Sequence, residues 1–162
     1  MALHKFCPDV YVCPKTGLMM PWYTVGMLEY LNTLDLSKKS VFEYGAGYST
    51  MWWRSICKRA EAVDDSETWS AAVDCWFEYD KEYITQAILK YNIVIIDGSY
   101  RKECLQYAID NCAKGTMIIC DNWLQPSCDI DWGNMPEVVA KYNPVVFKQP
   151  NHADWQTMYF YL

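Results

Sequence analysis

One stretch decides the fold: Val41-Phe42-Glu43-Tyr44-Gly45-Ala46-Gly47-Tyr48-Ser49-Thr50. Its apolar run ends in an acid, passes through two glycines separated by one residue, and reaches a Ser-Thr pair that predicts a helix start. Gly45 and Gly47 can adopt positive φ and let the backbone lie close to a bound molecule. Ser49 or Thr50 can cap the helix. The order predicts a buried strand, a ligand-facing turn and a helix, although a lone Gly-x-Gly also fits a plain connection.

The composition predicts one folded domain. The chain has 162 residues, of which 52% are apolar and 16% aromatic, enough to bury a core without metal or disulfide support. We expect a single domain over residues 1–162. Two Cys-Pro pairs and a Lys-Thr-Gly turn predict an irregular lead-in over residues 1–23.

Charge and cysteine usage restrict the partners. The net charge of −6 disfavours nucleic acid, because phosphate binding generally needs a basic surface. No apolar run reaches the length of a signal peptide core or a membrane span, so we expect a soluble, cytoplasmic protein with no membrane partner. The eight cysteines are expected to be free thiols, because several fall inside predicted helices and strands. His4, Cys7 and Cys13 could ligate zinc, but the absence of a C-x-x-C pair favours a loosely ordered leading segment.

Helical and strand patterns alternate along the chain. Spacing and capping signals predict helices over residues 24–34, 50–59, 66–73, 80–90, 101–112 and 136–142. Apolar runs predict strands over residues 41–44, 60–63, 75–77, 93–96, 116–120, 145–147 and 158–162. The last two are expected to form an antiparallel hairpin around a turn over residues 149–154. The predicted fold is α/β and doubly wound, with a mostly parallel sheet of about seven strands and an antiparallel C-terminal hairpin.

Acidic residues follow four of the predicted strands: Glu43, Asp64, Asp97 and Asp121. Open parallel sheets bind ligands beyond the carboxyl ends of their strands, so these acids are expected on one rim. Asp64 lies 21 residues after Glu43, close to the ~20-residue spacing at which an acid reaches a bound ribose. The alternative is that these four acids lie in separate solvent-exposed turns and form no common site.

From Pro21 onward the chain resembles the class I S-adenosylmethionine-dependent methyltransferases. The resemblance rests on the opening stretch, on Ala62-Val63-Asp64-Asp65, and on residues 92–98 and 114–123. An acid precedes Gly-x-Gly, as in that family, and Thr50 stands where a dinucleotide fingerprint has its third glycine. The predicted terminal hairpin also looks like the reversed last strand of that family.

The resemblance implies S-adenosylmethionine as the cofactor. Asp64 would accept from the ribose hydroxyls, Asp65 would approach the ribose or adenine, and Glu43 would organise the turn and the cofactor's amino group. Tyr23 or Tyr44 would add a cation-π contact to the sulfonium. The implied cofactor-binding residues are Tyr23, Glu43, Tyr44, Gly45, Ala46, Gly47, Ser49, Asp64, Asp65 and Asp97.

A finer resemblance concerns a metal. Asp97 and the pair Asp121-Asn122 look like the Asp, Asp-Asn set with which catechol-type O-methyltransferases hold a divalent ion, and these oxygens suit Mg²⁺. Those enzymes carry a lysine base three positions after the first Asp, where this chain has Tyr100, and Arg101-Lys102 come only next. Family members that bind no metal also carry Asp-Gly and Asp-Asn at the ends of these two strands. Asp97 and Tyr100 are therefore the candidate catalytic residues, and the metal stays open.

The function predicted from these features is methyl transfer to a small-molecule acceptor, at an oxygen. Two alternatives stay open: methylation of a protein or nucleic acid, and a cofactor-binding or partner module without catalysis. The chain has no inserted segment to recognise a substrate. Recognition would then come from residues 1–24, from the loop over residues 123–135, or from another subunit of a homo-oligomer.

Overall fold

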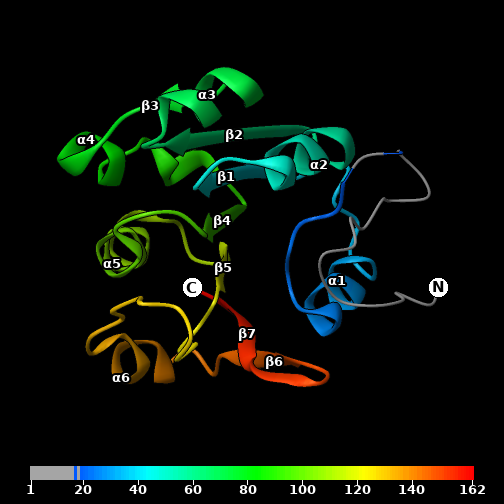
Figure 1. Cartoon of the computed structure of the whole chain (residues 1–162), viewed down its shortest axis with the longest axis vertical. Coiled ribbons are helices and arrows are strands. Elements are labelled where there is room, and N and C mark those ends of the chain that lie inside the picture. The colour runs from blue at the N-terminus through cyan, green and yellow to red at the C-terminus, as the bar shows by residue number, and fades with distance from the viewer. Residues whose placement is uncertain (1–16, 18) are drawn as a thin grey trace.

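The sheet has the predicted order of parallel and antiparallel strands. A computed structural model describes residue 17 and residues 19–162, and within them seven strands form one sheet in the order β3-β2-β1-β4-β5-β7-β6 (Figure 1). Strands β1 to β5 pair in parallel, and β7 runs antiparallel to both β5 and β6. The strands are β1 (Ser40–Tyr44), β2 (Arg59–Asp64), β3 (Trp76–Phe77), β4 (Ile93–Ile96), β5 (Met117–Asp121), β6 (Val145–Gln149) and β7 (His152–Tyr161).

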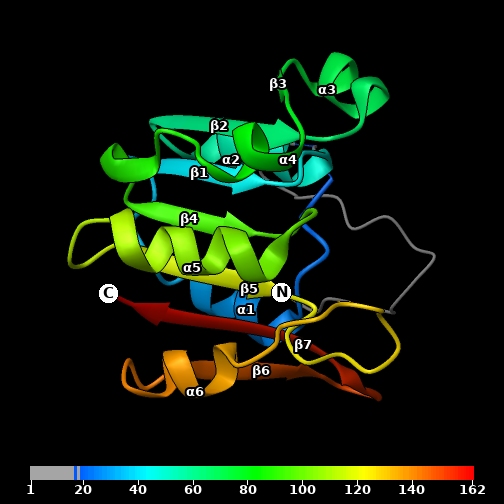
Figure 2. The same ribbon diagram turned by 90° about the vertical axis from the view of Figure 1, so that its left-hand side faces the viewer.

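Helices cover both faces of the sheet, as a doubly wound fold requires. Helices α1 and α2 lie on one face, and α4, α5 and α6 lie on the other (Figures 1 and 2). The helices are α1 (Val25–Leu31), α2 (Tyr48–Ile56), α3 (Glu67–Val73), α4 (Asp80–Ile84), α5 (Arg101–Asn111) and α6 (Met135–Ala140), with a 3₁₀ turn, η1 (Ile88–Lys90).

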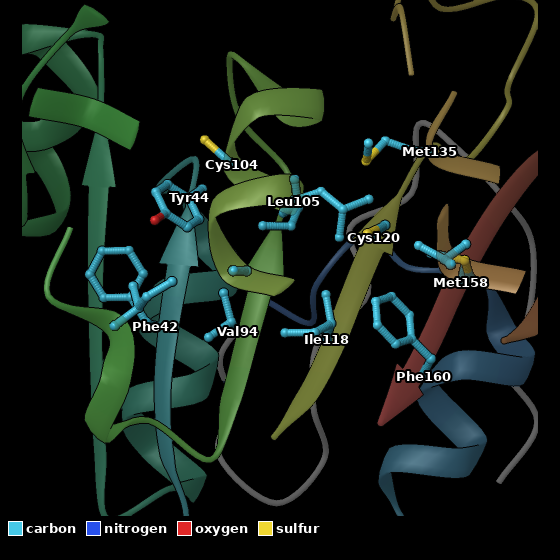
Figure 3. Packing of buried hydrophobic residues seen from close by; sticks show 14 of the residues in the cluster. Phe42, Tyr44, Val94, Cys104, Leu105, Ile118, Cys120, Met135, Met158 and Phe160 are labelled. Atoms are coloured by element: carbon cyan, nitrogen blue, oxygen red, sulfur yellow. The ribbon is translucent and has the colours of Figure 1, made fainter. Parts of the chain in front are cut away.

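The central strands are buried on both sides, which explains their unbroken apolar runs. Every residue of β4 and β5 is buried. On the α5 side, Phe42, Val94 and Ile118 meet Cys104 and Leu105 of the helix (Figure 3). Side chains of the opposite parity, such as those of Val41, Ile95 and Ile119, join the core under α1 and α2. The sheet is thus packed between two apolar layers.

The helix predicted over residues 80–90 is wrong as a single element. Tyr83 and Ile88 are both buried, and they lie five positions apart. On one continuous helix these positions would point about 140° apart, so both could not face the core. The chain therefore leaves α4 at Ile84 and restarts as η1, and this places Leu89 in solvent with 65% of its surface exposed. Ala87, in the segment between α4 and η1, is exposed as well.

The C-terminal hairpin and the lead-in also differ from the predictions. The hairpin turn is shorter than residues 149–154, because β6 continues to Gln149 and β7 begins at His152. Asn151 allows this tight connection by adopting a φ of 64°. The lead-in is also packed in its described part, since Met20 and Tyr23 are buried.

The structure tests only some of the remaining expectations. The six cysteines among the described residues are free. No helix in the described part of the chain is long and apolar enough to cross a membrane. His4, Cys7 and Cys13, considered above for zinc, lie outside the described residues. The cytoplasmic location and the homo-oligomer stay predictions.

The packing of α5 can be tested with a pair of leucines. We expect Leu105→Ala to lower the free energy of unfolding by about 2–5 kcal/mol, because Leu105 is fully buried between α5 and the sheet. Leu89→Ala serves as the control and should change it by less than about 0.5 kcal/mol. Chemical denaturation measures both values, and equal losses would contradict the break after Ile84.

Candidate functional site

A cavity opens at the carboxyl ends of the parallel strands. Its volume is about 340 Å³, within the range of small-molecule sites. The turn after β1 forms one wall, and the ends of β2 and β4 supply Asp64 and Asp97. The lining residues are Met20, Trp22, Gly45, Ala46, Gly47, Tyr48, Ser49, Asp64, Trp69, Asp97 and Gly98. Four strand-end acids were expected on this rim, and two of them line the cavity.

The two glycines of the turn have different tasks. Gly45 has a φ of 92°, and a Cβ there would lie 2.5 Å from the Cα and N atoms of Gly98. A Cβ on Gly98 would in turn meet Gly45 and the Tyr83 hydroxyl. Gly47 has extended backbone and open space around its missing side chain. Close approach to a ligand is therefore available at Gly47, whereas Gly45 is required by contact within the protein.

Two backbone amides donate hydrogen bonds to Asp64 and so fix the turn and the start of the next helix. Its Oδ2 accepts from the Ala46 amide at 2.7 Å, and its Oδ1 accepts from the Ser66 amide at 2.8 Å. Ser66 then caps α3 by accepting from the Trp69 amide. Burial raises the pKa of the Asp64 carboxyl, although both amides oppose that shift. Asp64 thus positions the glycine turn in addition to lining the cavity.

Glu43 lies beneath the turn in a buried hydrogen-bond network. Its Oε2 accepts from the Thr50 hydroxyl at 2.5 Å, and its Oε1 accepts from the Tyr23 hydroxyl at 3.4 Å. Thr50 also accepts from the Gly47 amide, while Trp53 donates to the Tyr23 oxygen. Burial raises the pKa of Glu43 to about 8, and these hydroxyls offset only part of the shift. Glu43 is thus linked to the turn through Thr50, which accepts from the Gly47 amide.

The ends of β4 and β5 carry a second polar cluster. Arg101 donates to Asp97 Oδ1 at 3.2 Å and to Asn122 Oδ1 at 3.1 Å. The Thr157 hydroxyl donates to Asp121 Oδ1 at 2.5 Å. Burial raises the pKa of Asp97 to about 6 although Arg101 lies beside it. The pKa of Asp121 is raised further by burial and by the nearby charge of Asp97.

The structure brings most of the predicted cofactor residues together. Those that line the cavity are Gly45, Ala46, Gly47, Ser49, Asp64 and Asp97. Glu43 and Tyr23 lie buried below them, and Asp65 is exposed next to Asp64.

Two predicted residues lie elsewhere. Tyr44 is fully buried on the α5 side of the sheet, and its hydroxyl donates to the Ile84 carbonyl. Tyr100 donates to Asp80 Oδ1 at 2.9 Å and is not among the lining residues. The Tyr44 side chain points away from the cavity because residues two positions apart on a strand face the same side of the sheet, and Phe42 faces α5. Neither side chain belongs to the cavity lining.

Sequence reasoning missed the aromatic side chains around the cavity. Trp22, Tyr48 and Trp69 line it and remain 61%, 48% and 42% exposed. Tyr48 and Trp69 pack edge to face, with ring centroids 5.7 Å apart. Large aromatics this exposed are a signal for binding once their place beside a cavity is known. In the sequence alone, the same residues fit a core equally well.

The implied metal does not fit the residues at β4 and β5. The Arg101 guanidinium already contacts the Asp97 carboxylate and the Asn122 amide oxygen that would hold it. Asp121 accepts from Thr157. Across residues 17 and 19–162, no group of three or more His, Cys, Asp or Glu side chains could hold a metal ion.

Comparison with known proteins identifies the fold. The sequence matches no family model and no curated protein. Among solved structures it is similar to the N-methyltransferase NodS from Bradyrhizobium japonicum WM9, with a TM-score of 0.58, 12% identity, and coverage of 84% of this chain and 94% of that one. The O-methyltransferase TomG from Streptomyces achromogenes, in complex with SAM, gives a TM-score of 0.60 at 14% identity, covering 95% of this chain and 82% of that one.

A putative caffeoyl-CoA O-methyltransferase from Staphylococcus aureus gives a TM-score of 0.59 at 15% identity, covering 88% of this chain and 86% of that one. The chain therefore has the class I methyltransferase fold. The neighbours include both O- and N-methyltransferases, so the fold does not select the atom that receives the methyl group.

The contact between Gly45 and Gly98 can be tested by comparing two glycines of positive φ. Gly115→Ala should cost about 1–2 kcal/mol of unfolding free energy, because its φ is 89° but nothing lies within 4 Å of the added Cβ. Gly45→Ala should cost more than about 4 kcal/mol, because the Cβ also meets the Gly98 backbone. Denaturant titration measures both. Similar costs would show that the Gly98 contact does not constrain the turn.

The buried carboxyl of Glu43 predicts a pH effect on stability. Its pKa rises from 4.5 to about 8 on folding, so the folded state holds the proton more tightly and stability falls as pH rises through this window. The slope from this one group is at most ~1.4 kcal/mol per pH unit. Glu43→Gln should make unfolding less pH-dependent between pH 5 and 8, whereas Glu29→Gln, at an exposed position on α1, should follow the native protein. Thermal unfolding without ligand checks this, and identical pH profiles for all three proteins would refute it.

Proposed function

We propose that the protein is an S-adenosylmethionine-dependent methyltransferase that acts on an oxygen atom of a small-molecule acceptor. The observation that carries the proposal is the cavity in which the Gly45–Gly47 turn, Asp64 and Asp97 meet. TomG is described in complex with SAM and NodS in complex with S-adenosyl-L-homocysteine, which supports this cofactor for the shared fold.

The residues of the cavity suit the parts of this cofactor. Gly47 leaves the turn open to the methionine portion, and the carboxylate of Asp64 can accept from ribose hydroxyls through its remaining lone pairs. Exposed Trp and Tyr rings beside the cavity favour flat, weakly charged groups such as a purine or an aromatic acceptor. The carboxyls of Glu43 and Asp97 favour a nearby positive charge.

An oxygen acceptor is favoured by the position of Asp97. When bound, the cofactor would supply an activated methyl group: sulfur would keep the electron pair of the broken bond, and a lone pair of the acceptor oxygen would form the new bond to carbon. That oxygen must lose its proton. Asp64 already accepts two backbone amides, whereas among the described residues Asp97 is held through Oδ1 alone and lines the cavity. Burial raises the pKa of this carboxyl above its usual value, toward the range of a general base, so Asp97 is the group that we assign to take the proton.

Substitution of Asp64 tests the proposed cofactor site. Asp64→Ala should weaken S-adenosylmethionine binding by about 10- to 100-fold, because hydrogen bonds to a charged group contribute about 1.5–3 kcal/mol. Asp64→Asn removes the negative charge but keeps an oxygen that can accept the Ala46 amide. It therefore separates the effect of the lost charge from the effect of a disturbed glycine turn. Asp110→Ala, at an exposed position on α5, should bind like the native protein.

Calorimetry and thermal unfolding of the same samples give the affinities and the folded fraction. A folded Asp64→Ala protein with unchanged affinity would show that the ribose is bound elsewhere. Transfer of a labelled methyl group to a panel of hydroxylated and amine acceptors then identifies the acceptor class. Transfer to amines alone would refute the oxygen assignment.

A further inference from the structure

Arg101 closes the polar cluster at the ends of β4 and β5. It is the first residue of α5 and lies four positions after Asp97 in the sequence. Its side chain is 12% exposed and reaches across the ends of both strands. This arrangement places a permanent positive charge among the three side chains that the sequence resemblance assigned to a metal.

Every N–H group of the guanidinium has an acceptor. Nε donates to the Gly98 carbonyl at 2.9 Å. Nη1 donates to the Asp121 carbonyl at 2.6 Å and to Asn122 Oδ1 at 3.1 Å. Nη2 donates to the Asp97 carbonyl at 2.8 Å and to Asp97 Oδ1 at 3.2 Å. An arginine side chain has five such donors, so none is left to bind a ligand.

The acceptors around Arg101 have the chemistry that a hard cation seeks. They comprise carbonyl oxygens, an amide oxygen and a carboxylate, and Mg²⁺ takes the same kinds of ligand. A divalent ion on these oxygens would lie against the guanidinium, and repulsion between like charges at such a distance is strong in a partly buried site. The metal and the arginine are therefore alternatives at this position.

We propose that Arg101 takes the place of a divalent cation at the ends of β4 and β5, so that the site works without a metal ion. The catalytic consequence of this inference rests on the proposed methyltransferase function. Arg101 acts as a positioning residue: it fixes Asp97 at the cavity wall and ties the loop after β4 to the end of β5. The oxygens that would coordinate a metal are instead the acceptors of one planar side chain.

Metal titration of the native protein tests the proposal without the cofactor. After treatment with EDTA, the protein is titrated with Mn²⁺, followed by electron paramagnetic resonance, and its unfolding temperature is measured with and without Mg²⁺. We expect no site tighter than roughly 1 mM that depends on Asp97, and no rise in unfolding temperature. A tighter Mn²⁺ site that Asp97→Asn abolishes would overturn the proposal.

Removal of the guanidinium should create the metal site. Arg101→Ala is expected to gain at least tenfold in Mn²⁺ affinity, and a second substitution, Asp97→Asn, should remove the gain. Arg101→Lys keeps a cation and should bind no more Mn²⁺ than the native protein does. A folded Arg101→Ala protein that gains no affinity would show that these oxygens are not a cation site. If that variant does not fold, the native titration decides.

Because no arm of these experiments contains S-adenosylmethionine, they are independent of the proposed function. A protein that binds no cofactor but behaves as predicted toward Mn²⁺ would refute the methyltransferase proposal alone. A protein that binds the cofactor and also holds Mn²⁺ through Asp97 would refute only the role of Arg101.

Discussion

The contact between the backbones of Gly45 and Gly98 is the constraint on which the site depends. It extends the pairing of β1 with β4, in which Tyr44 lies opposite Ile96 and the Asp97 amide donates to the Tyr44 carbonyl at 2.9 Å. Because neither residue carries a Cβ, the turn after β1 can lie directly against the end of β4. That approach brings Asp97 beside the turn, and Gly47 is left facing open space.

Electrostatics adds a second constraint at the same edge of the sheet. Burial raises the pKa of the carboxyls of Glu43, Asp97 and Asp121, and Arg101 is the guanidinium that faces two of these groups. Burial therefore disfavours the ionised form of these carboxyls, and Arg101 offsets that effect only in part at Asp97 and Asp121. A ligand that brings a cation would lower these pKa values, so binding and proton release are linked. A sulfonium fits this requirement, whereas an anionic ligand does not.

Much of the fold could be predicted because burial leaves a clear signal in the sequence. The runs at residues 93–96 and 116–120 lie in central strands, and the opening stretch forms the predicted strand, turn and helix. The break in the helix predicted over residues 80–90 could not be foreseen, because it follows from the tertiary burial of both Tyr83 and Ile88.

The site was harder to predict than the fold because it depends on contacts between distant residues. Strand alternation could have placed Tyr44 in the core with Phe42. No local pattern reveals that Gly45 meets Gly98, or that Arg101 also reaches Asp121 and Asn122. The resemblance to metal-dependent enzymes selected Asp97, Asp121 and Asn122, but not Arg101, which donates a hydrogen bond to each of these residues.

Hydrogen–deuterium exchange with and without S-adenosylmethionine tests most directly the central claim, that the glycine turn is one wall of a cofactor site. We expect the ligand to slow exchange in peptides that cover residues 45–49, 64–66 and 97–98, which border the cavity. Peptides from β6 and α6, which contribute no lining residue, should be unaffected. Unchanged exchange at the turn, or protection confined to another part of the chain, would contradict the account.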